Sequence, residues 1–223
     1  MPAADRSSDP QPTGAALRWT VLVPVKALPA AKSRLAGLST DADAHARLVH
    51  AIRDDTLRAA REASGVARVV RIGDTDDVEH DLLQRRPGLN EALAEGAQYA
   101  AAQWPADGVA ALVGDLPALT AAELARTLAV AAHHETAFVA DATGTGTTLL
   151  TARPAATLDP RFGPGSAARH GARGAALPAG PGLRQDVDTA DDLRAALLLG
   201  VGPRTLAVLA GQQSSAVYRH GAS

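Results

Sequence analysis

Short apolar runs alternate with amphipathic stretches along most of this chain, and this alternation restricts its fold more than any other feature. Runs of strand length occur at residues 19–25, 66–72, 109–113, 136–140, 147–151 and 184–187. Between them, helical spacing of apolar residues predicts helices at about 40–63, 90–104, 120–133 and 190–199, with Asn90, Thr120 and Thr189 as N-caps. Repeated strand–helix alternation predicts an α/β fold, a mainly parallel sheet with helices on both faces.

The chain of 223 residues contains no internal repeat and no linker, so we predict a single domain. Residues 1–16 are rich in Pro, Ser, Asp and Gly and lack the apolar centre of a signal peptide. We therefore expect a disordered tail over residues 1–17, a folded domain over 18–210 and a frayed polar tail over 211–223. No apolar stretch has the length needed to span a membrane, so a cytoplasmic location is expected.

Composition limits the core and excludes several kinds of chemistry. Hydrophobic residues make up 46% of the chain but aromatic residues only 3%, so Ala, Val and Leu must build the core. A net charge of −2 argues against a broad surface for nucleic acid or anionic membranes. The absence of cysteine excludes disulfides, thiolate catalysis and zinc–thiolate sites.

The 22 basic residues include only two lysines, and both occur in the segment VPVKALPAAKSRL, directly after the first predicted strand. Lys26, Lys32 and Arg34 thus follow the carboxyl end of a strand, where open α/β sheets bind phosphorylated ligands. A lysine ammonium is a compact charge that suits phosphate oxygens. The segment is interpreted as a phosphate-binding loop, and a solvated basic loop is the alternative.

Two acidic segments are candidate metal ligands. Asp115, in GDLPAL, follows a predicted strand, and Asp186 and Asp188 are two residues apart, so that in an extended segment both point to one side. Carboxylates in such pairs suit Mg²⁺, which takes one or two of them together with substrate phosphates and water. The alternatives are a turn residue for Asp115 and helix capping by Asp188 or Thr189.

Two glycine-rich segments, DATGTGTTLL and RFGPGSAARH, can let a ligand approach the backbone closely. Thr147, Thr148 and Ser166 offer hydroxyl groups and amides to an anion there. GTGTTL lacks the third glycine of a dinucleotide fingerprint, and the chain contains neither a GxxxxGK[ST] loop nor a GxSxG elbow. Phosphate binding without a covalent nucleophile is therefore the favoured chemistry.

Taken in order, VPVK, KSRL, GLNEAL, GDLPAL, GTGTTLL, FGPGSAARH and DVDTADDL resemble the phosphoenolpyruvate or 2-phospho-L-lactate guanylyltransferases of coenzyme F(420) biosynthesis. The resemblance runs from about residue 19 to residue 205. It implies a single-domain, three-layer α/β/α nucleotidyltransferase fold, Rossmann-like and of the glycosyltransferase-A type, with a mixed, mostly parallel sheet.

The resemblance also implies a reaction in which GTP and phosphoenolpyruvate give enolpyruvyl-diphospho-guanosine and pyrophosphate. The acceptor phosphate, with a second pKa near ~6, is already mostly ionised at neutral pH and needs no general base. Lys26, Lys32 and Arg34 would hold the triphosphate of GTP. Asp115, together with Asp186 and Asp188, would hold Mg²⁺, so that the two lysines and Asp115 are the expected catalytic residues.

By the same resemblance, Asn90 would meet the nucleotide, and Thr148, Gly163 and Ser166 would hold the phosphorylated acid. Arg161 and His170 flank that turn and are either further ligands or surface residues.

The arginine- and alanine-rich composition suggests a high-GC, actinobacterial genome, for which the family implies phosphoenolpyruvate as acceptor. 2-Phospho-L-lactate and 3-phosphoglycerate are the alternatives with the same chemistry. A nucleotidyltransferase or sugar transferase with another acceptor, and a non-catalytic GTP-binding protein, also stay open. A downstream transferase that receives the product is an expected partner.

Overall fold

The computed structural model describes residues 17–25, 42–74 and 79–220 of the chain. Lys26, Lys32 and Arg34 lie outside these residues. So do nearly all of the expected N-terminal tail and the end of the C-terminal one.

Within the described residues, seven strands form one sheet in the order β3-β2-β1-β4-β6-β5-β7. β6 is antiparallel to both of its neighbours, and the other pairs are parallel. The strands are β1 (Trp19–Val25), β2 (Val66–Gly73), β3 (Leu82–Leu83), β4 (Gly108–Leu112), β5 (Thr136–Ala140), β6 (Thr147–Ala152) and β7 (Ala175–Ala176). The predicted mixed, mostly parallel α/β sheet is therefore confirmed.

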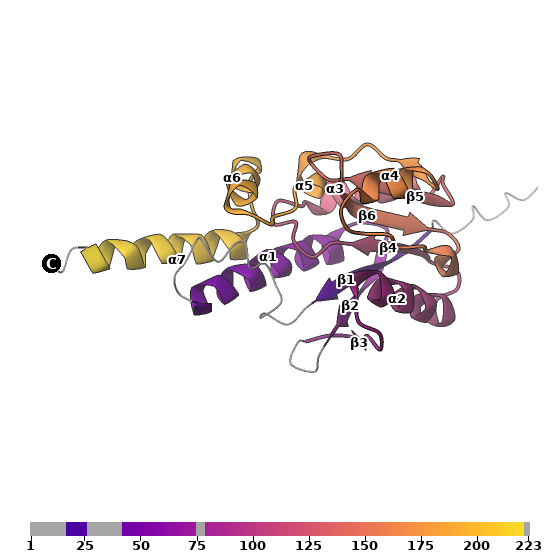
Figure 1. Cartoon of the computed structure of the whole chain (residues 1–223), viewed down its shortest axis with the longest axis horizontal. Helices are drawn as coiled ribbons and strands as arrows, with labels where there is room; N and C mark the ends of the chain where they lie inside the picture. The colour runs from indigo at the N-terminus through magenta and orange to yellow at the C-terminus, as the bar shows by residue number, and fades with distance from the viewer. Residues whose placement is uncertain (1–16, 26–41, 75–78, 221–223) are drawn as a thin grey trace, which may run out of the picture.

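Helices cover both faces of this sheet, which gives three layers (Figure 1). They are α1 (Ala42–Glu62), α2 (Leu89–Gln103), α3 (Ala121–Ala131), α4 (Ser166–Gly171), α5 (Pro181–Arg184), α6 (Ala190–Leu199), α7 (Pro203–His220) and the 3-10 helix η3 (Ala155–Thr157). Buried residues of α1, α3 and α5 pack on one face, and those of α2, η3 and α4 pack on the other. Small and aliphatic side chains fill most of both interfaces, as the composition predicts.

The predicted strand at 184–187 is wrong. Residues Pro181–Arg184 form the short helix α5, with Pro181 in its first turn, where its fixed φ and missing N–H are tolerated. The following residues belong to no strand of the described sheet. Thr120 and Thr189 cap α3 and α6 as predicted, each in a capping box.

α7 was not predicted, and it continues past Gly211 to His220. Its first turn is bound by α1, because Asp55 accepts hydrogen bonds from Arg204 N at 3.2 Å and Thr205 N at 2.8 Å. Asp55 is 1% exposed and therefore acts as a buried cap for α7. From this attachment α7 extends away from the sheet (Figure 1).

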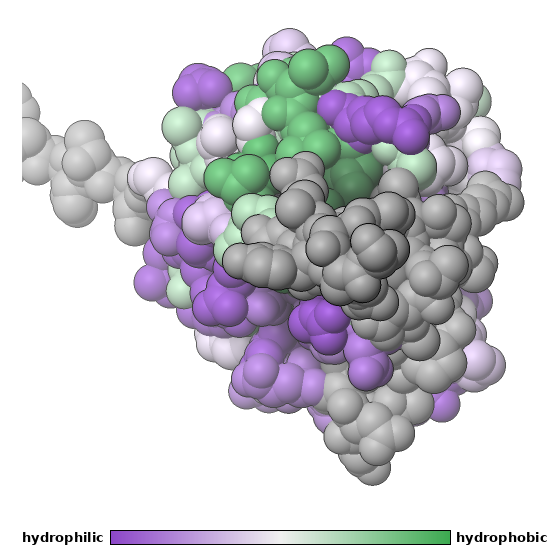
Figure 2. All heavy atoms as spheres, turned by 90° about the vertical axis from the view of Figure 1, so that its left-hand side faces the viewer, coloured by the Kyte–Doolittle hydropathy of each residue, from purple (hydrophilic) through white to green (hydrophobic). Residues whose placement is uncertain are grey.

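Exposed leucines gather near the junction of α6 and α7. Leu198 is 90% exposed and Leu206 is 56% exposed, with Leu197 and Leu199 beside them. Figure 2 shows apolar side chains together on the face of the molecule that carries these two helices. None of the described helices combines the length and the apolar character that crossing a bilayer requires.

Candidate active site

The sheet brings segments that are distant in sequence together at one end, where its parallel strands terminate. β1 pairs with β2 on one side and β4 on the other, so the strand order reverses between β1 and β4, where α/β sheets bind ligands at the carboxyl ends of their strands. Because β6 is antiparallel to β4 and β5, its first residues lie beside the last residues of both strands. The same end of the sheet therefore carries Asp115 after β4, Asp141 after β5 and Thr148 in β6.

The turn after β4 is held from three directions. Leu116 N donates to Thr56 Oγ1 of α1 at 3.0 Å, and Val187 N donates to Asp115 O at 3.1 Å. Gly202 N, just before α7, donates to Pro117 O at 2.8 Å. Asp115 is partly buried and stands on a backbone turn. The position of this turn depends on α1, on residues 186–188 (the DVD segment) and on the start of α7.

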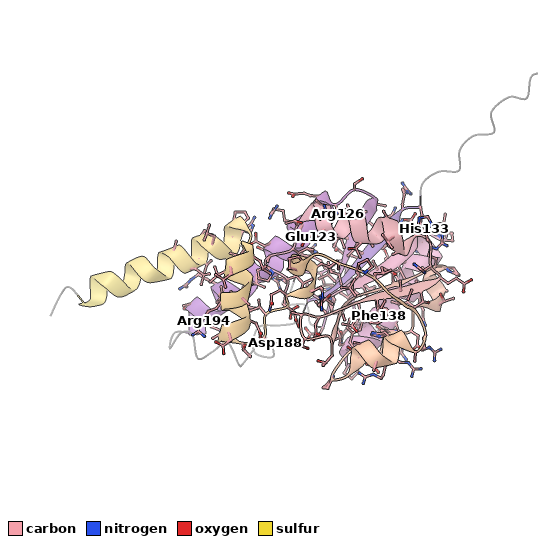
Figure 3. All side chains as sticks on the ribbon, turned by 90° about the horizontal axis from the view of Figure 1, so that it is seen from above. Glu123, Arg126, His133, Phe138, Asp188 and Arg194 are labelled. Atoms are coloured by element: carbon pink, nitrogen blue, oxygen red, sulfur yellow. The ribbon has the colours of Figure 1, made fainter. Side chains whose placement is uncertain are left out.

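The DVD segment carries the other two predicted metal ligands. Asp186 is half-buried, whereas Asp188 is exposed and precedes α6, as Figure 3 shows. Burial, followed by the negative charges of Asp115, Asp188 and Asp141, raises the pKa of Asp186 to about 7. The structure thus brings Asp115 and the DVD segment together, as predicted. Thr189 caps α6, so the cap does not need the Asp188 side chain.

The chemistry of this acidic group fits a divalent cation. A cation would balance the negative charges that contribute to the raised pKa of Asp186, and hard carboxylate oxygen atoms suit Mg²⁺. Among the described residues, however, no three His, Asp or Glu side chains are grouped closely enough to hold a metal ion by themselves. The donor set therefore fits an ion held by one or two carboxylates together with phosphate oxygens, and not a closed protein cage.

Asp141 organises the glycine-rich loop after β5, a role that the sequence reasoning missed. Its carboxylate accepts hydrogen bonds from Thr145 N and Gly146 N, both at 2.9 Å, and from Thr143 Oγ1 at 3.0 Å. An Asp followed by Thr and Gly residues is the signal of such a turn.

Arg184 ties this loop to the DVD segment. Its Nη2 donates to Asp141 O at 2.7 Å and its Nε to Ala140 O at 3.1 Å, while Ala142 N donates to Arg184 O at 2.8 Å. Asp186 follows two residues later, so the loop after β5 and the acidic segment form one connected unit.

The structure brings together the segments that carry Thr148, Gly163 and Ser166, the predicted ligands of the acid, because Ser166 bonds to Gly163 and to Thr147, the neighbour of Thr148. Thr148 and Ser166 are buried, at 0% and 1% exposed, and the Thr148 hydroxyl has no hydrogen-bond partner within the described residues. Ser166 Oγ donates to Thr147 Oγ1 at 3.1 Å, which links α4 to β6. Gly163 is exposed and has a φ of 115°, a conformation that favours glycine.

Asn90 does not cap α2, because Gly88 occupies the N-cap position. Instead its amide forms a pair of hydrogen bonds with one backbone residue: Oδ1 accepts from Phe162 N at 2.7 Å and Nδ2 donates to Phe162 O at 3.3 Å. Asn90 therefore holds residues 162–166, the FGPGS turn, against α2. The segment predicted to meet the nucleotide and the turn predicted to hold the acid are directly connected.

Arg161 and His170 differ in environment. Arg161 is exposed and pairs with Asp159 at 3.0 Å, in agreement with a surface residue. His170 is 2% exposed, so a surface position is wrong for it. Burial, and then the charge of Arg169, lowers the pKa of His170 to about 4, so its ring is neutral at physiological pH.

The chain has the fold of the nucleotide-diphospho-sugar transferases. A solved structure named as such a transferase, from Desulfovibrio desulfuricans, matches with a TM-score of 0.66 at 19% identity, over 92% of this chain and 98% of its own. At this identity, the match concerns the fold alone.

The chain belongs to the CofC-like guanylyl transferase family, whose model matches residues 19–213. Among its relatives, the phosphoenolpyruvate guanylyltransferase of Streptomyces coelicolor is 48% identical over 87% of this chain and 97% of its own length. The protein of the same name from Thermomonospora curvata is 47% identical over 88% of this chain and 90% of its own. The chain is therefore a nucleotidyltransferase of the guanylyltransferase type.

Proposed function

We propose that this protein transfers GMP from GTP to phosphoenolpyruvate, giving enolpyruvyl-diphospho-guanosine and pyrophosphate, in coenzyme F(420) biosynthesis. One observation carries the proposal. Asp115, the DVD segment and the FGPGS turn lie together at the end of the sheet where the parallel strands terminate. Relatives that share nearly half of the residues over most of the chain carry this activity in their names.

The acceptor phosphate attacks the α-phosphorus of GTP, one P–O bond forms, and the bond to pyrophosphate breaks. No proton must be removed, because the attacking oxygen is already ionised at neutral pH. What the protein must overcome is the repulsion between two polyanions, about 4 kcal/mol for each pair of unit charges ~4 Å apart at an effective dielectric of ~20.

In this reaction the protein acts by positioning and by charge. Lys26, Lys32 and Arg34 bind the triphosphate and the departing pyrophosphate, and the GLN turn at Asn90 lies beside the nucleotide. Thr148, with Gly163 and Ser166, binds the phosphorylated acid. The Thr148 hydroxyl has no hydrogen-bond partner among the described residues, which supports a role as a donor to this acid.

Asp115, Asp186 and Asp188 are the residues that would hold Mg²⁺. When bound, this ion would supply a positive charge that offsets the repulsion between the two substrates and stabilises the negative charge of the departing pyrophosphate. The pKa of Asp186, raised to about 7, is in keeping with a site where a cation balances the negative charge.

Pyrophosphate release from GTP and Mg²⁺ tests the function, with phosphoenolpyruvate, 2-phospho-L-lactate and 3-phosphoglycerate as separate acceptors. Asp115→Asn and Asp188→Asn are expected to keep less than about a tenth of the wild-type rate. Asp191→Asn is the matched control, because Asp191 lies three residues from Asp188 but is 87% exposed and pairs with Arg194.

Release with phosphoenolpyruvate alone would establish both reaction and acceptor, and release with another acid would move the substrate. An unchanged rate in Asp188→Asn would refute its assignment to the metal. The activated product is expected to pass to a downstream transferase. A parallel reaction with that enzyme should therefore show faster pyrophosphate release.

A further inference from the structure

His170, in the last turn of α4, is a buried polar residue that the proposed reaction does not use. Both of its ring nitrogens are hydrogen bonded: Nε2 lies 3.0 Å from Arg161 N, and Nδ1 lies 2.9 Å from Thr147 Oγ1. A backbone N–H can only donate, so Nε2 must accept. The neutral ring then carries its proton on Nδ1 and donates it to Thr147. The surroundings of His170 therefore select one tautomer.

These two hydrogen bonds connect the segments that carry the proposed acceptor ligands. Arg161 N stands at the start of the turn that leads through Gly163 to Ser166. Thr147 precedes Thr148 in β6, and the Thr147 hydroxyl also accepts a hydrogen bond from Ser166 Oγ at 3.1 Å. A single side chain thus links β6, the FGPGS turn and α4.

Packing keeps the ring of His170 in place. The ring of Phe162 meets it edge to face with the centroids 5.2 Å apart, and that of Phe138 lies at 6.1 Å. The turn is also held from outside, because the guanidinium of Arg169 donates to the carbonyl oxygens of Arg161, Gly163 and Pro164. Within the described part of the chain, Arg169 donates to carbonyl groups of the turn, and His170 is the side chain of α4 that accepts from one of its N–H groups.

We propose that His170 is a positioning residue for the acceptor: its neutral ring fixes the FGPGS turn and the Ser166 hydroxyl relative to Thr148, without touching the acceptor. The inference rests on the proposed function, from which the acceptor ligands are taken. Donors that are already ordered bind an anion more tightly than donors that must first lose their freedom. His170 should therefore control the affinity for the acceptor and leave the affinity for GTP unchanged.

Two substitutions separate the roles of the ring nitrogens. His170→Gln can bring an amide oxygen near the position of Nε2 and keep an acceptor for Arg161 N. The shorter side chain of His170→Asn reaches only to the position of Nδ1, so the backbone N–H of Arg161 loses its acceptor. His133→Gln is the control, since His133 is exposed and Figure 3 shows it well apart from Asp188.

Rates of pyrophosphate release give separate KM values for phosphoenolpyruvate and GTP. Calorimetry measures phosphoenolpyruvate binding to enzyme saturated with α,β-methylene GTP, which cannot transfer its nucleotide. We expect His170→Asn to weaken phosphoenolpyruvate binding and raise its KM about tenfold or more, with the KM for GTP within about twofold of wild type. His170→Gln should recover most of the affinity, and the control should match wild type.

An unchanged KM for phosphoenolpyruvate in His170→Asn, or equal increases in both KM values, would overturn the inference. Amide hydrogen exchange tests it without turnover: residues 161–167 should exchange faster in His170→Asn than in His170→Gln, and equal exchange would contradict it. If the wild-type protein releases no pyrophosphate with phosphoenolpyruvate, the proposed function fails. The exchange rates still decide whether His170 holds the turn.

Discussion

Acid should destabilise this protein through His170, and the size of the effect follows from its environment. Burial is the main cause that lowers the pKa of His170 from 6.5 to about 4; the charges of Arg169 and Arg161 lower it further, while Asp159 opposes them. Between these two pH values the unfolded chain binds a proton that the folded chain rejects. His170 therefore does not lower the free energy of unfolding above about pH 6.5. As the pH falls below this value it lowers that free energy increasingly, and below about pH 4 the loss stays constant.

At pH 5 the two pKa values correspond to a loss of about 2 kcal/mol from this group alone. The measurement is urea unfolding of the wild-type protein and His170→Gln at pH 7.5 and pH 5. Carboxylates that titrate in the same range affect both proteins, so the difference between the two losses isolates the histidine. An equal loss of stability in both proteins would refute the reasoning.

Three further predictions concern the supports of the site. Thr56→Val removes the acceptor of Leu116 N and should cost about 1–3 kcal/mol in urea unfolding and lower kcat/KM, whereas Thr56→Ser should retain both. Gly182→Ala would place a Cβ 2.2 Å from Ala118 O, so we expect a loss of more than about 2 kcal/mol in the same assay. Asp55→Ala removes the cap of α7 and should lower stability by about 1–2 kcal/mol, measured by thermal unfolding.

The local sequence was informative wherever one strong pattern decided the structure. The run WTVLVPV forms β1, and Thr120 and Thr189 cap α3 and α6, because these features depend on neighbours within a few residues. The strand predicted at 184–187 was wrong because it was based on local alternation alone. Its alternation resembles a strand, but Pro181 and the contacts of Gly182 with the loop after β4 favour a helical turn.

α7 illustrates a different limit. Its sequence becomes polar after Gly211, and its first turn depends on Asp55, 150 residues away from Thr205. No window along the sequence contains both partners of that hydrogen bond, so local patterns cannot predict it. The same is true of Asn90. The sequence pattern predicts it as the N-cap of a helix, but its side chain binds the backbone of Phe162.

By itself, the sequence determined the class of fold and the chemical types available to the site: lysines after the first strand, aspartates after a later one, and hydroxyls in glycine-rich segments. These follow from periodicity and from the intrinsic chemistry of each side chain. Only the tertiary structure decided that Asp186 shares the field of Asp115, that Asn90 and Arg184 hold loops, and that His170 is buried and neutral. Burial, distance and hydrogen-bond partners belong to the packed molecule, because they arise only when distant segments meet.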